Sequence, residues 1–153
     1  MRILYFDINR TITFEYTCKP ALAGGALEKA VREAGFERLV CVSNVENIIR
    51  LVSDLGQQPD SLEIIFRMCW GAFSDLKWFR QVTITVPGSE RRASYIDFSG
   101  DWWYLDDRAR EYFEREGLAD AYAANIGGRI LAPEAESDGS EILAWLRGMP
   151  ANP

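Results

Sequence analysis

The sequence predicts an α/β domain in which a parallel sheet carries helices on both faces. Two observations favour this class. Short apolar runs alternate with segments of helical periodicity over residues 2–55, and the connections between them are short. Three apolar runs also end in a polar side chain, at Asp7, Ser43 and Asp106. Because parallel strands end at the same edge of a sheet, these three side chains are expected to meet at one site.

The first part of the chain follows a strand-helix-strand-helix order. We predict strands over Arg2–Ile8 and Arg38–Ser43, because each is a short apolar run. A helix is predicted over Ala26–Ala34, where apolar residues recur at helical spacing and a glycine follows. A second helix is predicted over Val45–Leu55, with Asn44 as its N-cap. This order, with its short links, predicts a parallel sheet with helices on its faces.

The middle of the chain has weaker signals. Residues 60–63 fit a capping box, and the apolar face that follows extends as far as Phe73 on helical spacing. Residues 82–86 alternate between apolar and polar side chains and predict a strand. Residues 89–98 fit either a helical turn or the return arm of a hairpin, and the pattern does not distinguish the two.

Four elements are predicted in the last third of the chain. They are a strand over Trp102–Leu105, a helix over Asp107–Glu116, a short strand over about Ala121–Asn125, and a helix over Glu141–Arg147 capped by Ser140. We expect residues 1–148 to form one domain and residues 149–153 to form a frayed tail.

The composition excludes several classes of function. The chain has 153 residues and a net charge of −6, which argues against non-specific binding of nucleic acid. It has no histidine, so Ser-His-Asp and Cys-His catalysis are excluded. Its three cysteines form no CxxC pair, which argues against structural zinc and fits a cytoplasmic protein with reduced thiols. No apolar stretch is long enough to span a membrane.

Three motifs resemble those of a known family. Residues 5–11 read Tyr-Phe-Asp-Ile-Asn-Arg-Thr, residues 40–43 end in a serine that Asn44 follows, and residues 104–107 end in paired aspartates. Their order, strand-end placement and spacing resemble the first, second and fourth motifs of the haloacid dehalogenase-like (HAD) superfamily, most of whose members are phosphatases. The resemblance implies a three-layer Rossmann-like fold. The links after the first strand and between the strands that end at Ser43 and Asp106 are too short for a large cap domain.

The resemblance also implies a set of site residues. The metal ligands for Mg²⁺ would be the Asp7 side chain, the backbone carbonyl of Asn9, Asp106, and Asp107 acting through water. Asp7 would be the nucleophile and form an aspartyl-phosphate. Thr11, Ser43 and Asn44 would bind the phosphoryl group of a phosphorylated substrate.

The third motif of the family is a Lys or Arg that pairs with the nucleophile. Lys77 is the choice from spacing, because it precedes the paired acids by a reasonable interval. Three arginines compete for the role, at positions 80, 91 and 92.

Asn9 is the main departure from the family pattern. It stands where phosphatases of the family have a second acid, and an amide cannot act as general acid or base. Two functions therefore stay open. One is an Mg²⁺-dependent phosphatase or phosphotransferase that is slow because of Asn9. The other is a catalytically weakened domain that binds a phosphorylated ligand or a protein. An open site of this kind suits a bulky substrate, such as a phosphoprotein or a nucleic-acid end, or a homo-oligomer that covers it.

Overall fold

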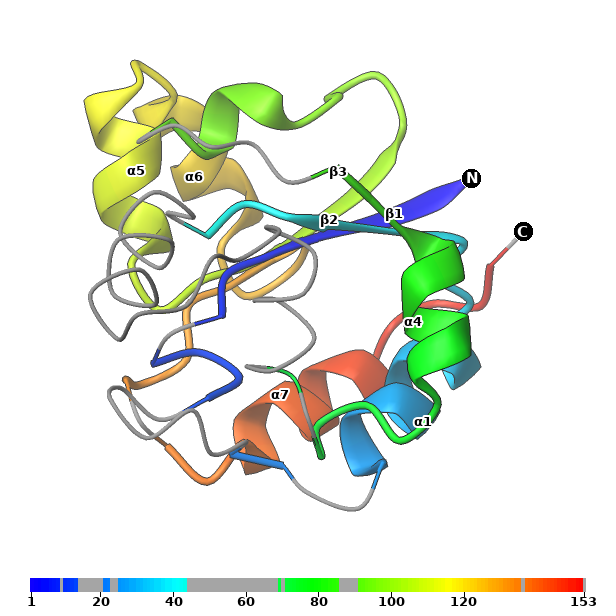
Figure 1. Cartoon of the computed structure of the whole chain (residues 1–153). Coiled ribbons are helices and arrows are strands. Elements are labelled where there is room, and N and C mark those ends of the chain that lie inside the picture. The colour runs from blue at the N-terminus through cyan, green and yellow to red at the C-terminus, as the bar shows by residue number, and fades with distance from the viewer. Residues whose placement is uncertain are drawn as a thin grey trace, which may run out of the picture.

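The computed structural model describes residues 1–8, 10–13, 21–22, 25–43, 69, 71–85, 91–135 and 137–152. Within these ranges, five parallel strands form one sheet in the order β3-β2-β1-β4-β5 (Figure 1). The strands are β1 (Arg2–Phe6), β2 (Arg38–Cys41), β3 (Thr83–Thr85), β4 (Asp101–Leu105) and β5 (Ile130–Leu131). The helices are α1 (Ala26–Glu33), α4 (Leu76–Val82), α5 (Ala109–Arg115), α6 (Ala119–Asn125) and α7 (Ser140–Arg147), with a 3₁₀ turn η1 (Ala93–Tyr95).

Helices cover both faces of the sheet, which makes three layers. In Figure 1, α5 and α6 lie on one side of the strands, and α1 and α7 lie on the other. The central strands β1 and β4 are buried on both faces, and their side chains alternate between two cores. Trp103 packs in the core under α1 and α7, whereas Trp102 packs in the core under α5 and α6. The predicted Rossmann-like α/β architecture is therefore present.

The end of α1 follows the sequence prediction closely. Gly35 has φ 76° and donates its N–H to the carbonyl of Arg32 (3.0 Å), while Phe36 donates to Val31 (3.4 Å). These two bonds form a Schellman motif, in which the left-handed residue is usually glycine. Phe36 is buried and returns the chain to β2.

The prediction was wrong over the segment that follows α5. Residues 121–125 form helix α6, and the last strand of the sheet is β5. Leu118, Ala121 and Tyr122 face the core together, at helical spacing, whereas a strand would have placed alternate residues inward. Alanine is the strongest helix former, and the alternation of small residues in this segment was mistaken for a strand pattern.

Four further segments differ from the sequence prediction or decide what it left open. Residues 71–73 form a turn and a bridge, so the helix expected to reach Phe73 does not include them. Helix α4 was not predicted; the Asp75 carboxylate accepts the Trp78 N–H (3.1 Å) at its start, and Phe79 is its fully buried contact. Residues 93–95 adopt a helical turn, which decides between the two alternatives for that segment. Ser140 is the first residue of α7, and Asp138 accepts its N–H (2.9 Å).

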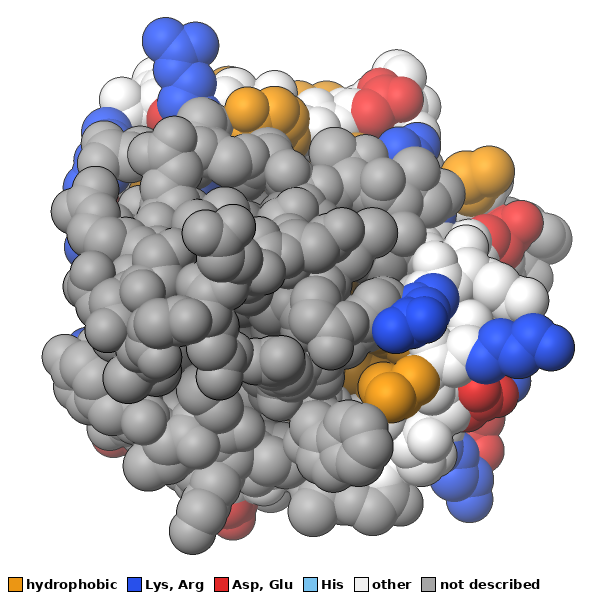
Figure 2. Space-filling view, in the orientation of Figure 1, with side chains coloured by type: hydrophobic (Ala, Val, Ile, Leu, Met, Phe, Trp, Pro, Cys, Tyr) orange, Lys and Arg blue, Asp and Glu red, His pale blue; other side chains and the backbone are white. Residues whose placement is uncertain are grey.

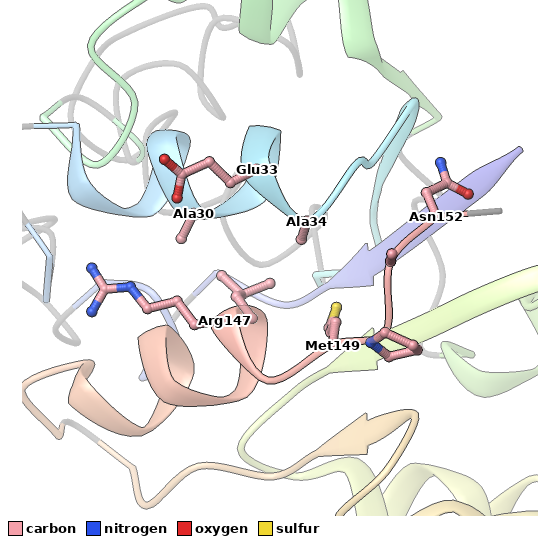
Figure 3. Close-up of a pocket in the computed structure, with 9 residues that line it drawn as sticks. Ala30, Glu33, Ala34, Arg147, Met149 and Asn152 are labelled. Atoms are coloured by element: carbon pink, nitrogen blue, oxygen red, sulfur yellow. The ribbon is translucent and has the colours of Figure 1, made fainter.

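The end of the chain, expected to be frayed, makes defined contacts as far as Asn152. The Pro150 carbonyl accepts a hydrogen bond from Arg2 (2.9 Å), and Asn152 donates to the Gly35 carbonyl (3.1 Å). A pocket lies between α1, α7 and this segment, with Glu33, Arg147 and Met149 among its lining residues (Figure 3). Because Arg2 begins β1, the pocket is at the amino edge of the sheet. None of the helices in the described ranges is long and apolar enough to cross a membrane.

Candidate active site

The strand order places a candidate site at the carboxyl ends of β1 and β4. Strands β2 and β3 follow β1 in the chain and lie on one side of it in the sheet. The next strand, β4, lies on the other side of β1. Ligands of open α/β sheets bind at such a reversal point, because the connections there diverge. Phe6 is paired with Leu105, so Asp7 and Asp106 each follow the last paired residue of their strands. The Asp7 N–H donates to the Leu105 carbonyl (2.8 Å), which fixes the two ends together.

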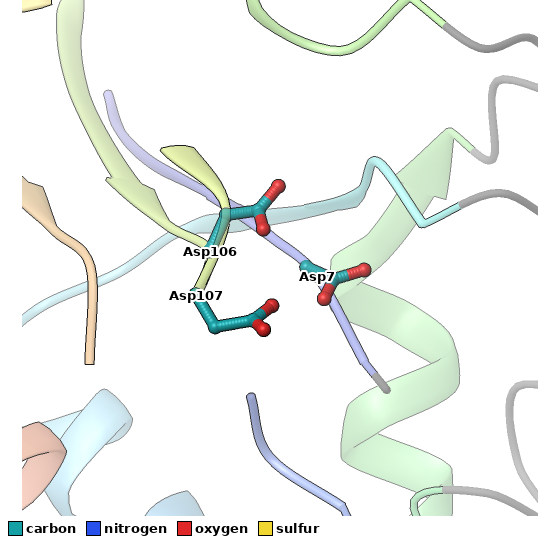
Figure 4. Close-up of side chains that lie close together, drawn as sticks. All are labelled: Asp7, Asp106 and Asp107. Carbon is teal, nitrogen blue, oxygen red and sulfur yellow. The ribbon is translucent and has the colours of Figure 1, made fainter. Parts of the chain in front are cut away.

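Three carboxylates meet at this edge. Asp7, Asp106 and Asp107 each offer an oxygen, and these oxygens lie within 4.8 Å of one another (Figure 4). Asp7 is 2% exposed and Asp106 is 0% exposed, while Asp107 is half-buried. Buried carboxylates this close together are costly unless cations or hydrogen-bond donors compensate them.

Two hydroxyl groups compensate part of the charge. The Thr11 hydroxyl lies 2.9 Å from Oδ2 of Asp7 and 3.0 Å from Oδ1 of Asp107, and donates to one of them at a time because it has one proton. The same hydroxyl accepts the Asp107 N–H (3.1 Å). Ser43 is buried after β2, and its hydrogen bond to Asp7 helps to lower the pKa of that carboxyl. The predicted convergence of the ends of β1, β2 and β4 is confirmed.

Among the described residues, Arg92 is the cation that pairs with the buried acids. Its Nη1 lies 3.0 Å from Oδ1 of Asp7 and 2.8 Å from Oδ2 of Asp106, and the side chain is almost fully buried. The ring of Tyr112 lies against the other side of the guanidinium, with Cζ 4.0 Å from the ring centroid. Arg92 thus bridges the two buried acids.

Lys77, which the spacing favoured for this role, lies elsewhere on the surface. Lys77 is exposed on α4. Around α1 and α4, basic and acidic side chains of the described residues are interspersed on the face shown in Figure 2. The choice of Lys77 as the cation paired with Asp7 is corrected to Arg92. Spacing along the chain could not decide this, because the arginine and the acids are brought together only by packing of η1 against α5.

Glu116 holds the segment that carries Arg92. Its carboxylate accepts the backbone N–H groups of Arg92 (3.0 Å), Ala93 (3.1 Å) and Ser94 (3.1 Å), and the Ser94 hydroxyl (2.7 Å). The paired acids precede α5, Tyr112 lies within it and Glu116 follows it. One short helix therefore fixes the arginine relative to the acids, and neither Tyr112 nor Glu116 was singled out from the sequence.

Burial controls the proton affinity of the acids. The pKa of Asp106 is raised to about 6 by burial and by the nearby charge of Asp7, with Arg92 opposing both. The pKa of Asp7 is raised mainly by burial, with Arg92 opposing, and the pKa of Asp107 is raised by burial and by Asp106. Asp106 also accepts hydrogen bonds from the Tyr104 hydroxyl (3.0 Å) and the Arg108 N–H (2.9 Å).

Two polar atoms at the site lack a hydrogen bond from the described residues. They are Oδ1 of Asp7, although Arg92 lies close to it, and Nε of Arg92. Oδ1 of Asp7 still has its ion pair with Arg92, so among the described residues it is the buried Nε donor of Arg92 that leaves capacity for a ligand. The side chains of Asp7, Asp106 and Asp107 could hold a hard divalent cation, because all of their donor atoms are carboxylate oxygens.

Several predicted features lie outside the described residues. They are Asn9, Asn44, the helix at 45–55 and the capping box at 60–63. Comparison of the chain with protein-family models, with curated proteins and with solved structures finds no match.

We expect the metal-free protein to lose stability as the pH rises from about 4 to about 6. The raised pKa of Asp106 means that the folded state binds its proton more tightly than the unfolded state, so deprotonation in this window favours unfolding. Urea unfolding followed by tryptophan fluorescence at several pH values measures the effect, with Asp106→Asn as the control. If the wild type and Asp106→Asn show the same pH slope, Asp106 does not carry a raised pKa.

Proposed function

We propose that the chain is an HAD-like, Mg²⁺-dependent phosphotransferase or phosphatase that acts through an aspartyl-phosphate on Asp7. The observation that carries the proposal is the cluster of Asp7, Asp106 and Asp107 with Arg92 at the reversal point of the sheet. An isolated aspartate at a strand end is more often a turn cap. A buried group of three acids with a bridging arginine has a large desolvation cost, and such costs are typical of functional sites.

The oxygen donors of the site fit the proposed metal. Mg²⁺ is bound in proteins by one or two carboxylates together with water and substrate oxygens, and the three acids supply that chemistry. Asp7 and Asp106 would bind it directly, with Asp107 acting through water and the backbone carbonyl of Asn9 completing the protein ligands. When bound, Mg²⁺ would neutralise charge on the phosphoryl oxygens.

In the proposed reaction, an Asp7 oxygen attacks phosphorus while the bond from phosphorus to the leaving oxygen breaks. Arg92 is placed to neutralise phosphoryl charge, since its Nε is buried and has no hydrogen-bond partner among the described residues. Ser43 and Thr11 present hydroxyls beside the nucleophile. The leaving oxygen takes its proton from water, because Asn9 has none to give. Water then attacks the aspartyl-phosphate and releases phosphate, or an acceptor alcohol takes the group.

A binding function is the second candidate, and Arg92 is the observation that favours it. The arginine already pairs with both Asp7 and Asp106, so the buried acids are partly neutralised by the protein itself. Together with Asn9, this arrangement suits a domain that holds a phosphorylated ligand or a protein partner without efficient turnover.

Calorimetry with Mg²⁺ tests the metal site. We expect Asp106→Ala and Asp7→Asn each to weaken Mg²⁺ binding more than about tenfold, because the first removes a direct ligand and the second replaces a carboxylate ligand with a neutral amide. Asp120→Ala, which removes an exposed acid on α6, should leave the affinity unchanged. Equal affinity in the wild type and Asp106→Ala would refute the metal site and with it the proposed reaction.

A further inference from the structure

Tyr104 places a phenol hydroxyl inside the core, next to the candidate site. Its side chain lies on β4, is fully buried, and packs edge-to-face against Phe113, with the ring centroids 5.2 Å apart. Because this packing fixes the ring, the position of the hydroxyl is set by the fold. The hydroxyl donates to Oδ2 of Asp106 (3.0 Å). Phenylalanine would fill the same volume, so the hydroxyl is what a tyrosine adds at this position.

The donors around Asp106 leave an acceptor position of its carboxylate for a ligand. A carboxylate has about four such positions, two on each oxygen. Among the described residues, Oδ2 accepts Nη1 of Arg92 (2.8 Å) as well as the Tyr104 hydroxyl, and Oδ1 accepts the Arg108 N–H (2.9 Å). The remaining position is on Oδ1, where one bond to a metal can form without displacing any of these donors.

The two donors on Oδ2 respond differently to a metal ion. Arg92 is a cation, so a divalent cation bound to Asp106 would repel it. Arg92 is also the group that would neutralise phosphoryl charge in the proposed reaction. Tyr104 is neutral and lies in the core, so its hydrogen bond to Oδ2 is compatible both with a metal on Oδ1 and with phosphate on Arg92. Hydrogen-bond partners of this kind orient metal ligands in proteins.

We propose that Tyr104 is a positioning residue for Asp106, and that its hydroxyl holds the carboxylate in the orientation that leaves Oδ1 for Mg²⁺. The inference rests on the proposed function, because it concerns the Mg²⁺ site that the acids would form. In this role Tyr104 contacts neither metal nor substrate and acts only through Asp106. A carboxylate that is already held by its partner loses less conformational freedom when the metal binds.

Paired tyrosine-to-phenylalanine variants test the proposal by calorimetry with Mg²⁺. Tyr104→Phe removes only the hydroxyl, and we expect it to weaken Mg²⁺ binding about tenfold, the lower end of the usual effect of such partners. Tyr5→Phe is the matched control. Tyr5 is paired with Tyr104 across β1 and β4 and is buried in the same core, but its hydroxyl accepts the Asp97 N–H (3.1 Å). Each variant loses one hydrogen bond, so both should show a similar small fall in the urea midpoint, and only Tyr104→Phe should lose Mg²⁺ affinity.

The preference for Mg²⁺ over Ca²⁺ is a second measurement, which a general loss of stability would not change. Mg²⁺ requires a nearly octahedral set of oxygens, whereas Ca²⁺ accepts a flexible one. A carboxylate of Asp106 that is no longer held should therefore reduce the affinity for Mg²⁺ more than the affinity for Ca²⁺. We expect this shift in Tyr104→Phe and an unchanged preference in Tyr5→Phe.

The outcomes separate this inference from the proposed function. If the wild type binds Mg²⁺ and Tyr104→Phe binds it equally well, or if Tyr5→Phe shows the same loss, the role of Tyr104 is refuted while the metal site stands. Equal losses of Mg²⁺ and Ca²⁺ affinity in Tyr104→Phe would also overturn it, because the hydroxyl would then not set the geometry of the ligand. If the wild type binds no Mg²⁺, the metal site itself is refuted, and the role of Tyr104 with it.

Discussion

Replacing Asn9 with aspartate is expected to raise the hydrolysis of an aryl phosphate about 10²-fold or more in the presence of Mg²⁺. The new carboxyl would protonate the leaving oxygen and then activate water against the aspartyl-phosphate, and general acid-base help of this kind typically contributes 10²–10⁴-fold. Steady-state rates of the wild type and Asn9→Asp, measured with a poor and with an activated leaving group, report on phosphoryl transfer to Asp7 and on hydrolysis of the aspartyl-phosphate. The gain in the first step should be smaller for the activated group, because it needs little protonation.

The same prediction has a chemical signature in the wild type. Without an acid at position 9, the aspartyl-phosphate should form and break down slowly, so acid-quenched protein should carry one phosphoryl group by mass. Asp7→Asn should abolish both the adduct and the gain in turnover from Asn9→Asp. If Asn9→Asp gives no gain and Asp7→Asn leaves residual activity unchanged, Asp7 is not the nucleophile, and the binding function is preferred.

Replacing Arg92 with methionine is expected to destabilise the fold by about 3–5 kcal/mol. The change keeps an apolar stem of similar length but leaves Asp7 and Asp106 buried without their common cation. Uncompensated buried charge is among the most costly defects a single substitution can introduce. Urea unfolding at neutral pH measures the loss. The defect should be smaller at acidic pH, where the buried carboxyl groups are protonated.

A double-mutant cycle separates the free energy of the Arg92–Asp106 ion pair from the loss of packing caused by Arg92→Met. Asp106→Asn removes one of the two buried charges, so Arg92→Met should cost less in the Asp106→Asn background than in the wild type. Arg110→Met is the matched control, because Arg110 pairs with Glu114 (2.8 Å) on the exposed face of α5. Its effect should stay below about 1 kcal/mol, the usual limit for a surface ion pair. Equal losses in Arg92→Met and Arg110→Met would show that the buried bridge contributes nothing to stability.

The central sheet was predictable from the sequence because strands buried on both faces are continuous apolar runs. Residues 3–6 and 102–105 have this pattern, and the polar residues that follow them mark the carboxyl edge. This pattern predicts that Asp7, Ser43 and Asp106 lie at one edge of the sheet, and the strand order agrees. The capping glycine after α1 was predictable for a similar reason, since the left-handed end of a helix favours glycine.

The sequence was less informative where local pattern and tertiary packing disagree. The small residues of α6 alternate like those of a strand, and only the core formed by Phe113 and its neighbours shows which of them face inward. The edge strand β3 has three residues. The alternating pattern of residues 82–86 predicts a strand that begins at Val82, whereas Val82 is the last residue of α4 and β3 begins at Thr83. Short elements have few residues to establish a period, so their type depends on what they pack against.

The sequence by itself determined the parallel α/β class, the polar residues that follow the central strands, and the three acids of the candidate site. These are local properties, because a buried strand and the residue that ends it are adjacent in the chain. Only the tertiary structure decided which cation joins the acids. Arg92 reaches Asp7 and Asp106 because Glu116 and Tyr112 hold its segment against α5. A contact between residues far apart in the chain is set by packing, and no spacing rule specifies it.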